Sequence, residues 1–340
     1  MTEQLLDFEG PVASFNESLS KLPNTEDNAA AIAGLQKEKK ALLKKIYADL
    51  TPWQTCMVAR HPARPYMMDY VNALFTDFEE LHGDRHFADD ASIVGGLARF
   101  GKTSLMLIGQ QKGRDTKERM RRNFGMTKPE GYRKAQRLMK LAEKFNLPVV
   151  TFIDTPGAFP GIDAEERGQS EAIGYSLYTM AGLRVPVISF VIGEGGSGGA
   201  LALGVSDKIY MLQYAVYSVI SPEGCSAILF KDQTLVGKAA DALCITADRL
   251  LELGLIDAVV PEPLGGAHRD YAGAAAAVKK VLTQALKSFK GEDWNSLPDQ
   301  RQKKWRNFGK YAELALRPEK KTESSVTGRQ AEQPGDGEIK

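Results

Sequence analysis

The amino-acid sequence predicts an α/β fold with a largely parallel sheet, and three features of the chain lead to this prediction. Two short apolar runs, LPVVTFID (147–154) and VPVISFVIG (185–193), have the length of buried strands. A segment with helical periodicity separates them, which is the pattern of parallel strand–helix–strand units. Each run also ends in a loop rich in glycine or proline, and open α/β sheets bind their ligands at such ends. We therefore expect the functional site there.

The composition is that of an ordinary globular protein of 340 residues, with 43% hydrophobic and 26% charged residues. Lys and Arg total 44 against 43 Asp and Glu, so no net field attracts nucleic acid or an anionic membrane. Cys56, Cys225 and Cys244 form no CxxC pair, which argues against a zinc ribbon, a disulfide framework and any bound metal. Because the chain shows neither a signal peptide nor a membrane span, we expect a cytoplasmic protein.

Residues 1–90 are expected to form an N-terminal helical region. Apolar residues from Ile32 to Leu50 recur at helical spacing among lysines, which predicts an amphipathic helix. Thr51 and Pro52 form an N-cap and first helical position, and a further helix is expected over 65–81.

The segment 91–315 is expected to form the main domain, beginning with two strands that meet in a hairpin at Gly101-Lys102. Thr127 and Glu130 have the spacing of a capping box, which predicts the start of a helix. Further helices are expected up to Tyr178, from Gly199, over 246–253 and over 272–289, and further strands over 208–212, over 217–221 and in LIDAVVP (255–261). The polar residues 316–340 lack periodicity and are expected to be a disordered tail.

The segment GEGGSGG (193–199) is open to several interpretations. It satisfies GxGxxG, the dinucleotide-binding pattern, although no acid follows about twenty residues later where the ribose would need one. It also contains GxSxG around Ser197, and Asp257 and His268 follow in the order of a serine hydrolase. A third interpretation is an oxyanion hole made of two adjacent amides at a helix N-terminus. Finally, the glycines can serve only to allow close strand–helix packing.

A second loop, DTPGAFPG (154–161), follows the preceding strand and contains two prolines and two glycines. We expect a rigid turn that presents its amides at the same edge of the sheet. The segment 112–122 carries six cations, which either contact phosphates or a carrier protein, or form a solvated loop.

Five segments resemble one family, the carboxyltransferase alpha subunits of the multi-subunit, bacterial-type acetyl-CoA carboxylase. They are FEELHGDR (78–85), IDTPGAFPG (153–161), AEERGQSEAI (164–173), GEGGSGGALA (193–202) and SVISPEGC (218–225). The resemblance implies the crotonase fold, a spiral of ββα units.

The resemblance also implies a function and partners. The family transfers the carboxyl group of carboxybiotin, carried on the biotin carboxyl carrier protein, to acetyl-CoA and so forms malonyl-CoA, the first committed step of fatty-acid synthesis. It implies a beta subunit with a zinc ribbon and most of the acetyl-CoA pocket, in an assembly of two alpha and two beta subunits, together with biotin carboxylase.

By the same resemblance, the N–H groups of Gly198 and Gly199 would be catalytic, because they would stabilise the negative charge that develops on the ureido oxygen of biotin. The residues expected to bind substrate are Gly195, Gly196, Ala200, Gly157 and Ala158.

Overall fold

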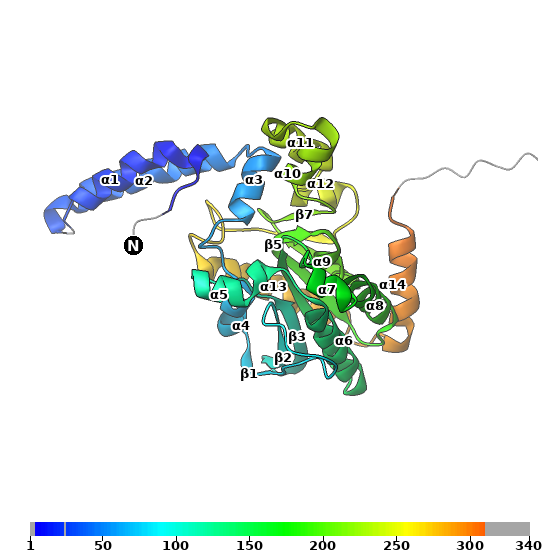
Figure 1. Ribbon diagram of the computed structural model, residues 1–340. Helices are drawn as coiled ribbons and strands as arrows, with labels where there is room; N and C mark the ends of the chain where they lie inside the picture. The colour runs from blue at the N-terminus through cyan, green and yellow to red at the C-terminus, as the bar shows by residue number, and fades with distance from the viewer. Residues whose placement is uncertain (1–3, 24, 310–340) are drawn as a thin grey trace, which may run out of the picture. The chain divides into compact units, whose positions relative to one another are not determined.

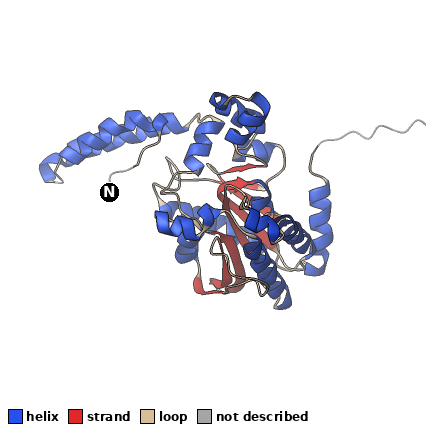
Figure 2. Cartoon of the chain, in the orientation of Figure 1, coloured by secondary structure: helices blue, strands red, loops and turns tan. Residues whose placement is uncertain are grey.

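The computed structural model describes residues 4–23 and 25–309 (Figures 1 and 2). These residues contain one mixed sheet of eight strands. Its order is β1-β2-β3-β4-β5-β6-β8, and β7 pairs with the end of β5. The first three strands are antiparallel, whereas the pairs from β3 to β8 are parallel, which confirms the predicted pairing. The strands are β1 (Thr76–Glu80), β2 (Ile93–Phe100), β3 (Thr103–Gln110), β4 (Val149–Thr155), β5 (Val187–Gly196), β6 (Lys208–Leu212), β7 (Val216–Ser218) and β8 (Ala258–Val260).

Helices connect these strands and precede them. The α-helices are α1 (Ala13–Lys21), α2 (Ala29–Tyr47), α3 (Pro52–Ala59), α4 (Met67–Leu74), α5 (Thr116–Arg121), α6 (Pro129–Lys144), α7 (Ile162–Glu166), α8 (Gln169–Gly182), α9 (Ser197–Leu201), α10 (Pro222–Cys225), α11 (Val236–Leu243), α12 (Ala247–Glu252), α13 (Tyr271–Ser288) and α14 (Leu297–Arg306). A π-helix, η4 (Ser226–Phe230), follows α10. Among the described helices, none is both long and apolar enough to cross a membrane.

The sheet separates two sets of helices. Ile108 and Gly109 are consecutive in β3 and so point to opposite faces. A Cβ on Gly95, the partner of Ile108, would lie 2.5 Å from Leu138 of α6, whereas a Cβ on Gly109 would lie 2.8 Å from the sulfur of Met67 in α4. Hence α6 covers one face together with α8, and α4 covers the other together with α13.

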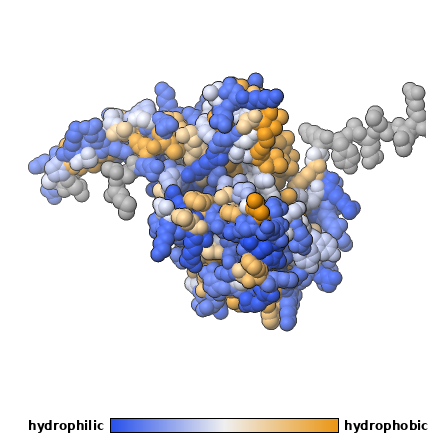
Figure 3. Space-filling view, in the orientation of Figure 1, coloured by the Kyte–Doolittle hydropathy of each residue, from blue (hydrophilic) through white to orange (hydrophobic). Residues whose placement is uncertain are grey.

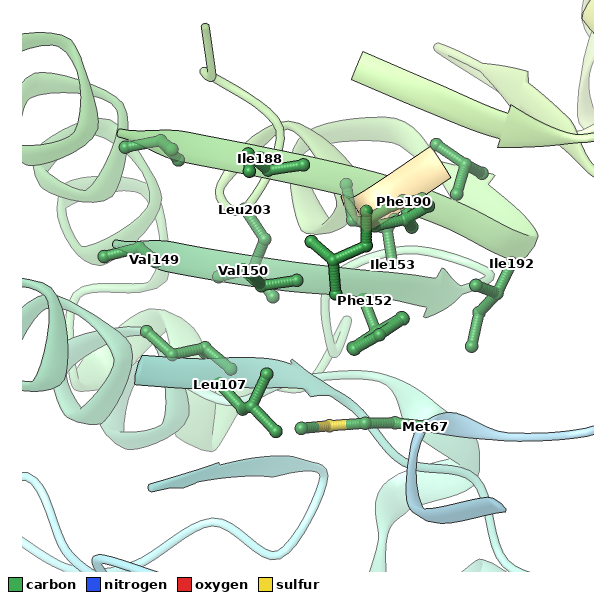
Figure 4. Close-up of a cluster of buried hydrophobic side chains, with 14 of the residues drawn as sticks. Met67, Leu107, Val149, Val150, Phe152, Ile153, Ile188, Phe190, Ile192 and Leu203 are labelled. Carbon is green, nitrogen blue, oxygen red and sulfur yellow. The ribbon is translucent and has the colours of Figure 1, made fainter. Parts of the chain in front are cut away.

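Aromatic rings hold the middle of the sheet in register (Figure 4). Phe152 in β4 stacks on Phe190 in β5, with ring centroids 5.7 Å apart, and Tyr70 of α4 stacks on Phe152 at 5.9 Å. Both phenylalanines are fully buried, and so is every residue of β4. Burying a side chain of this size stabilises a fold by roughly 1.5–3 kcal/mol. The same packing therefore fixes the positions of the loops that follow β4 and β5.

The N-terminal helices have a small core of their own. Leu43 and Tyr47 of α2 pack with Val12, Val58 and Tyr214 in a cluster separate from the main core. The predicted amphipathic helix is therefore confirmed, and four of its five lysines are exposed, whereas Lys39 is half-buried.

Two sequence-based expectations are wrong. The helix expected over 65–81 ends at Leu74, and 76–80 form the edge strand β1, because pairing with β2 overrides the local helical pattern. The capping box at Thr127 does not form: α6 begins at Pro129, while Thr127 accepts a hydrogen bond from Ser92 and forms a bridge with Ala158. The tail expected at 316–340 lies outside the described residues.

Helix α14, which the sequence did not predict, anchors the amino ends of the parallel strands. Its Arg301 is fully buried, donates to the carbonyl oxygens of Met180 and Leu183, and pairs with Asp207 at 2.8 Å. The same carboxylate accepts the N–H of Val187 at the start of β5. A single guanidinium thus joins α8, β5 and α14.

Replacing this guanidinium, as in Arg301→Met, would leave the Asp207 carboxylate without its cation and take the Arg301 donors from the buried carbonyls of Leu183 and Val185. We expect the free energy of unfolding in urea to fall by about 3–5 kcal/mol. Lys303→Met, at an exposed position of the same helix, is the control and should change it by less than about 0.5 kcal/mol. Equal effects of the two substitutions would show that Arg301 does not anchor the sheet.

Candidate functional site

Two loops lie side by side at the carboxyl edge of the sheet, as the sequence predicted. The first, residues 156–161, follows β4, and the second is the turn from Gly196 into α9 after β5. β4 and β5 are parallel neighbours, with Thr155 opposite Gly195, so both loops leave the sheet at the same edge (Figure 1).

The backbones of the two loops touch at two glycines. A Cβ on Gly196 would lie 2.2 Å from the carbonyl oxygen of Pro156, and a Cβ on Gly199 would lie 2.7–2.9 Å from backbone atoms of Gly157 and Ala158. Any side chain at these positions would push the loops apart. At Gly196 and Gly199, then, the glycines serve close packing.

The first turn of α9 directs backbone N–H groups toward this edge. The carbonyl of Gly198 accepts the N–H of Ala202 along the helix. In a planar trans peptide the N–H points opposite to the C=O, so the N–H of Gly199 points out of the helix N-terminus. The N–H groups of Ser197 and Gly198 belong to the same turn and have no intrahelical acceptor. The Gly199 N–H therefore points in the direction an anion requires, and the Gly198 N–H beside it has no acceptor within the helix.

Exposure differs among the predicted site residues. Gly198 is half-buried and a Cβ there would meet only the Ile173 side chain at 3.5 Å, which is ordinary contact. Gly195, Gly199 and Ala200 are buried, and Gly195 packs against Tyr217. Within α9, the open position is therefore Gly198.

The first loop contributes an open backbone surface. Gly157 has φ +155°, and a Cβ there would meet nothing within 4 Å. Its N–H donates to the hydroxyl of Thr155 at 3.1 Å, so this amide is already used within the chain. Ala158 is half-buried and bridges to Thr127. Gly157 thus offers space to a ligand, and its amide is not the donor that the sequence suggested.

Gln110 at the end of β3 ties the end of β4 to the first turn of α9, and sequence reasoning missed it. Its amide oxygen accepts the N–H of Asp154 at 3.1 Å, and its amide nitrogen donates to the carbonyl of Gly199 at 3.0 Å. The side chain is fully buried. The available signal was a glutamine pair closing the apolar run TSLMLIG.

A chain of ion pairs lies beside the loops. The Lys112 ammonium is 2.7 Å from Asp154 Oδ1 and 2.9 Å from Glu194 Oε2. Arg60 contacts the other oxygen of Glu194 at 2.6 Å and also pairs with Glu223. Asp154, Lys112 and Glu194 come from the ends of β4, β3 and β5, so this chain, which we call the ion-pair chain, fixes three neighbouring strand ends.

Burial and the charges of the ion-pair chain shift the pKa values of two groups, Glu194 and the neighbouring Cys56. Burial would raise the pKa of Glu194, but the charges of Lys112 and Arg60 outweigh burial and lower the pKa to about 2. Burial raises the pKa of the neighbouring Cys56 thiol to about 12. Glu194 is therefore a permanent carboxylate and Cys56 a neutral thiol at physiological pH.

The basic segment 112–122 divides between cations that bind other parts of the chain and the exposed Lys117 and Arg121. Lys112 belongs to the ion-pair chain, and Arg114 donates to the carbonyls of Pro62 and Arg64. Arg122 donates to the carbonyl of Ala91 and pairs with Glu118. These cations hold backbone segments together.

The serine hydrolase interpretation lacks its triad. Ser197 has φ +52°, a left-handed conformation, but His268 stacks on His61 with ring centroids 3.9 Å apart, and Asp257 pairs with Lys304. Within residues 4–23 and 25–309, no hydrogen bond joins a histidine to Ser197. Burial also lowers the pKa of His268 to about 3. Nor does an acid follow β6 to bind a ribose, since Gln213 stands there.

Comparison with known proteins identifies close relatives. A family model described as acetyl co-enzyme A carboxylase carboxyltransferase-like matches residues 5–309. The acetyl-coenzyme A carboxylase carboxyl transferase subunit alpha of Cupriavidus necator is 58% identical over 318 residues, which cover 92% of this chain and 98% of the relative. The protein of the same name from Azoarcus sp. is 58% identical over 93% of this chain and 100% of its own length.

Solved structures share the fold at low identity. A Pseudomonas malonate decarboxylase hetero-tetramer in complex with coenzyme A aligns with a TM-score of 0.56 and 16% identity, over 69% of this chain and 91% of that one. Transcarboxylase 12S aligns with a TM-score of 0.54 and 20% identity, over 66% of this chain and 42% of that one. The crotonase-like fold expected from the sequence is confirmed.

The depressed pKa of Glu194 leads to a prediction about acid stability. A carboxylate whose folded pKa is about 2 and whose ordinary value is 4.5 stabilises the fold above pH 4.5 and loses this contribution as the pH falls toward 2. In Glu194→Gln we expect the loss of unfolding free energy between pH 4.5 and 2 to be smaller than in the wild type, by up to about 3 kcal/mol.

Chemical unfolding at several pH values measures this difference. Glu38→Gln, which removes an exposed carboxylate of α2, should reproduce the wild-type pH dependence. A Glu194→Gln profile parallel to the wild-type profile would contradict the ion-pair chain.

Proposed function

The chain belongs to the family of acetyl-coenzyme A carboxylase carboxyl transferase alpha subunits, and from this we propose that the edge between its two loops is the biotin side of the carboxyl transfer site. The reaction is carboxyl transfer within an acetyl-CoA carboxylase, with acetyl-CoA as substrate and malonyl-CoA as the product used in fatty-acid synthesis. The single observation that carries the site assignment is the first turn of α9, where the N–H groups of Gly198 and Gly199 lack an acceptor within the helix and that of Gly199 points out of it.

The residues at this edge suit a biotin ring. The bare Cα of Gly157 faces open space, and a Cβ at Gly198 would still find room, so neither position crowds a flat group placed against the touching loops. Biotin, when bound there, supplies the carboxyl group and accumulates negative charge on its ureido oxygen as the carboxyl group leaves. The N–H groups of Gly198 and Gly199 would donate to that oxygen. Losing one such donor typically costs on the order of a hundredfold to a thousandfold in rate.

Rigid loops make this contribution effective. Amides stabilise a developing charge well only when they need not reorganise during the reaction. Gln110 and the ion-pair chain fix the strand ends from which the two loops leave the sheet, and the glycine contacts hold the loops against each other. The chain would thus act through its backbone, without a side chain that transfers a proton.

A partner subunit would complete the site. We assign this role to a beta subunit with a zinc ribbon, in an assembly of two alpha and two beta subunits that receives biotin from its carrier protein after biotin carboxylase has acted. Support comes from exposed apolar side chains near the loop edge: Val219 is 76% exposed, and Ile228 and Leu229 of η4 are 67% and 69% exposed. Figure 3 shows apolar surface over the region that includes α10 to α12. Such patches are typical of protein interfaces. The cytoplasmic location stays a prediction.

The requirement for a partner can be tested with purified proteins. We expect no malonyl-CoA from this chain alone when carboxybiotin and acetyl-CoA are supplied, and clear formation once the beta subunit is added. Malonyl-CoA production at the same rate by the isolated chain would contradict the shared site.

Gly198 offers the sharpest test of the amide site. Its position has room for a Cβ, so Gly198→Val should leave assembly and the unfolding midpoint nearly unchanged while its methyl groups occupy the space of the ligand. We expect the rate of carboxyl transfer by the assembled enzyme to fall at least a hundredfold, by the usual cost of a lost oxyanion contact.

Ser197→Ala, at the exposed neighbouring position, is the matched control and should retain most of the activity. Loss of nearly all activity in Ser197→Ala would instead point to a serine nucleophile, and full activity in Gly198→Val would remove this turn from the mechanism.

A further inference from the structure

We propose that a groove between α6, α8 and the loop after β1 binds the phosphate groups of a nucleotide-like ligand. Its volume is about 680 Å³, and its cationic lining consists of Arg85, Arg133, Arg137 and Lys140, with Tyr175 at one side. This volume lies in the range of small-molecule pockets. The proposal is independent of the amide site, since none of these residues belongs to the two loops. We call it the cationic groove.

Three of its cations are held by neutral oxygens. Arg137 donates to the carbonyls of Gly83 and His82 at 3.0 and 3.1 Å, and Arg85 donates to the same His82 carbonyl at 2.9 Å. Lys140 donates to the phenol of Tyr175 at 3.0 Å. Within residues 4–23 and 25–309, no carboxylate lies within 4.0 Å of these three cations.

The acids of the groove leave an excess of positive charge. The Asp84 carboxylate pairs with Arg133 at 2.8 Å and accepts three backbone N–H groups, including that of His86. The charges of Asp84 and Arg133 therefore compensate each other. Glu171 is an exposed carboxylate at the rim. Against it stand Arg85, Arg137 and Lys140, which gives a net charge of about +2 for the free groups.

Carbonyl contacts orient these side chains without cancelling their charge. Burial and the nearby charge of Arg85 lower the pKa of Arg137, although the charges of Asp89 and Asp84 act in the opposite direction. An anion bound between Arg85 and Arg137 would offset the like charges of the two guanidinium groups. Phosphate is the favoured anion because a guanidinium presents paired donors that match two phosphate oxygens. Arg137 already uses Nε and Nη2 on carbonyls, so within the described residues Arg85, which is bonded through Nη1, keeps such a pair.

An aromatic surface adjoins the cations. Tyr175 and Tyr178 of α8 stack with ring centroids 5.8 Å apart, and the Lys140 ammonium lies 4.6 Å from the centre of the Tyr175 ring. Tyr178 is 74% exposed. Exposed rings beside cations are suited to stack a planar base whose phosphates contact the cations. A nucleotide therefore fits the groove better than an acidic protein segment, which would leave the rings unused.

Two sources would supply such a ligand: the phosphorylated adenosine end of acetyl-CoA, or a separate nucleotide. Binding to the full-length chain, measured by calorimetry at low salt, tests the shared chemistry. The probe is adenosine 3′,5′-bisphosphate, and adenosine is its phosphate-free counterpart. We expect the bisphosphate to bind and adenosine to bind far more weakly, and we expect added NaCl to weaken the bisphosphate.

Substitutions at exposed positions of the groove distinguish a loss of ligand binding from a loss of folding. Arg85→Asn suits the left-handed backbone of that residue, which has φ +64°, and Lys140→Gln removes the second charge. Each should weaken bisphosphate binding about tenfold, as expected for one charged hydrogen bond. Lys144→Gln, at an exposed position of α6 outside the groove, is the matched control and should bind like the wild type. Unchanged unfolding midpoints establish that all three variants fold.

The outcomes are distinct. Failure of the wild type to bind the bisphosphate, or equal binding by wild type and both groove variants, overturns the proposal, and so does binding of an acidic protein alone. If both groove variants also raise KM for acetyl-CoA in the assembled enzyme with kcat unchanged, the ligand is the substrate. If KM is unchanged, the ligand is a separate nucleotide. None of these results affects the Gly198→Val test of the amide site.

Discussion

The contact of the Lys112 ammonium with the carboxylates of Asp154 and Glu194 is the interaction on which the site depends, because it joins the ends of β3, β4 and β5. These side chains are largely buried, and a charge inside a protein is stable only when it is paired and hydrogen-bonded. Removing the Lys112 ammonium would leave the buried Asp154 carboxylate without its cation, whereas Glu194 would keep Arg60. The strand ends are therefore coupled: a displacement of one loop would break ion pairs that also hold its neighbour.

The two loops that follow these ion-paired strand ends meet without side chains between them. Gly196 and Gly199 allow backbone-to-backbone contact, and Gln110 fixes the peptide groups on either side. Because this backbone is held by close packing and hydrogen bonds, it can adopt few conformations, and the N–H groups of α9 keep their direction. The proposed role of those N–H groups follows from this rigidity, since preorganised dipoles stabilise charge better than mobile side chains do.

The chain uses its cations in two different ways. Around the loops, Lys112 and Arg60 are neutralised by carboxylates, which makes their role structural and leaves ligand binding to the backbone. In the cationic groove, Arg85 and Arg137 are oriented by carbonyl groups instead and keep their full charge. The difference in partner, carboxylate or carbonyl, decides which cations can still attract an anion.

The apolar strands β4 and β5, the β2–β3 hairpin, the glycine-rich turn and the family could be predicted from the sequence, because period, length and turn chemistry are local properties of a chain. It failed at 76–80 and at Thr127, where pairing with distant segments overrode local preference. The fold was needed to show that Lys112 is largely buried, that Gln110 joins the end of β4 to α9, and that Gly199 packs against Gly157 while Gly198 stays open. These contacts join residues more than 40 positions apart, and burial, charge pairing and backbone approach exist only after the sheet has brought such residues together.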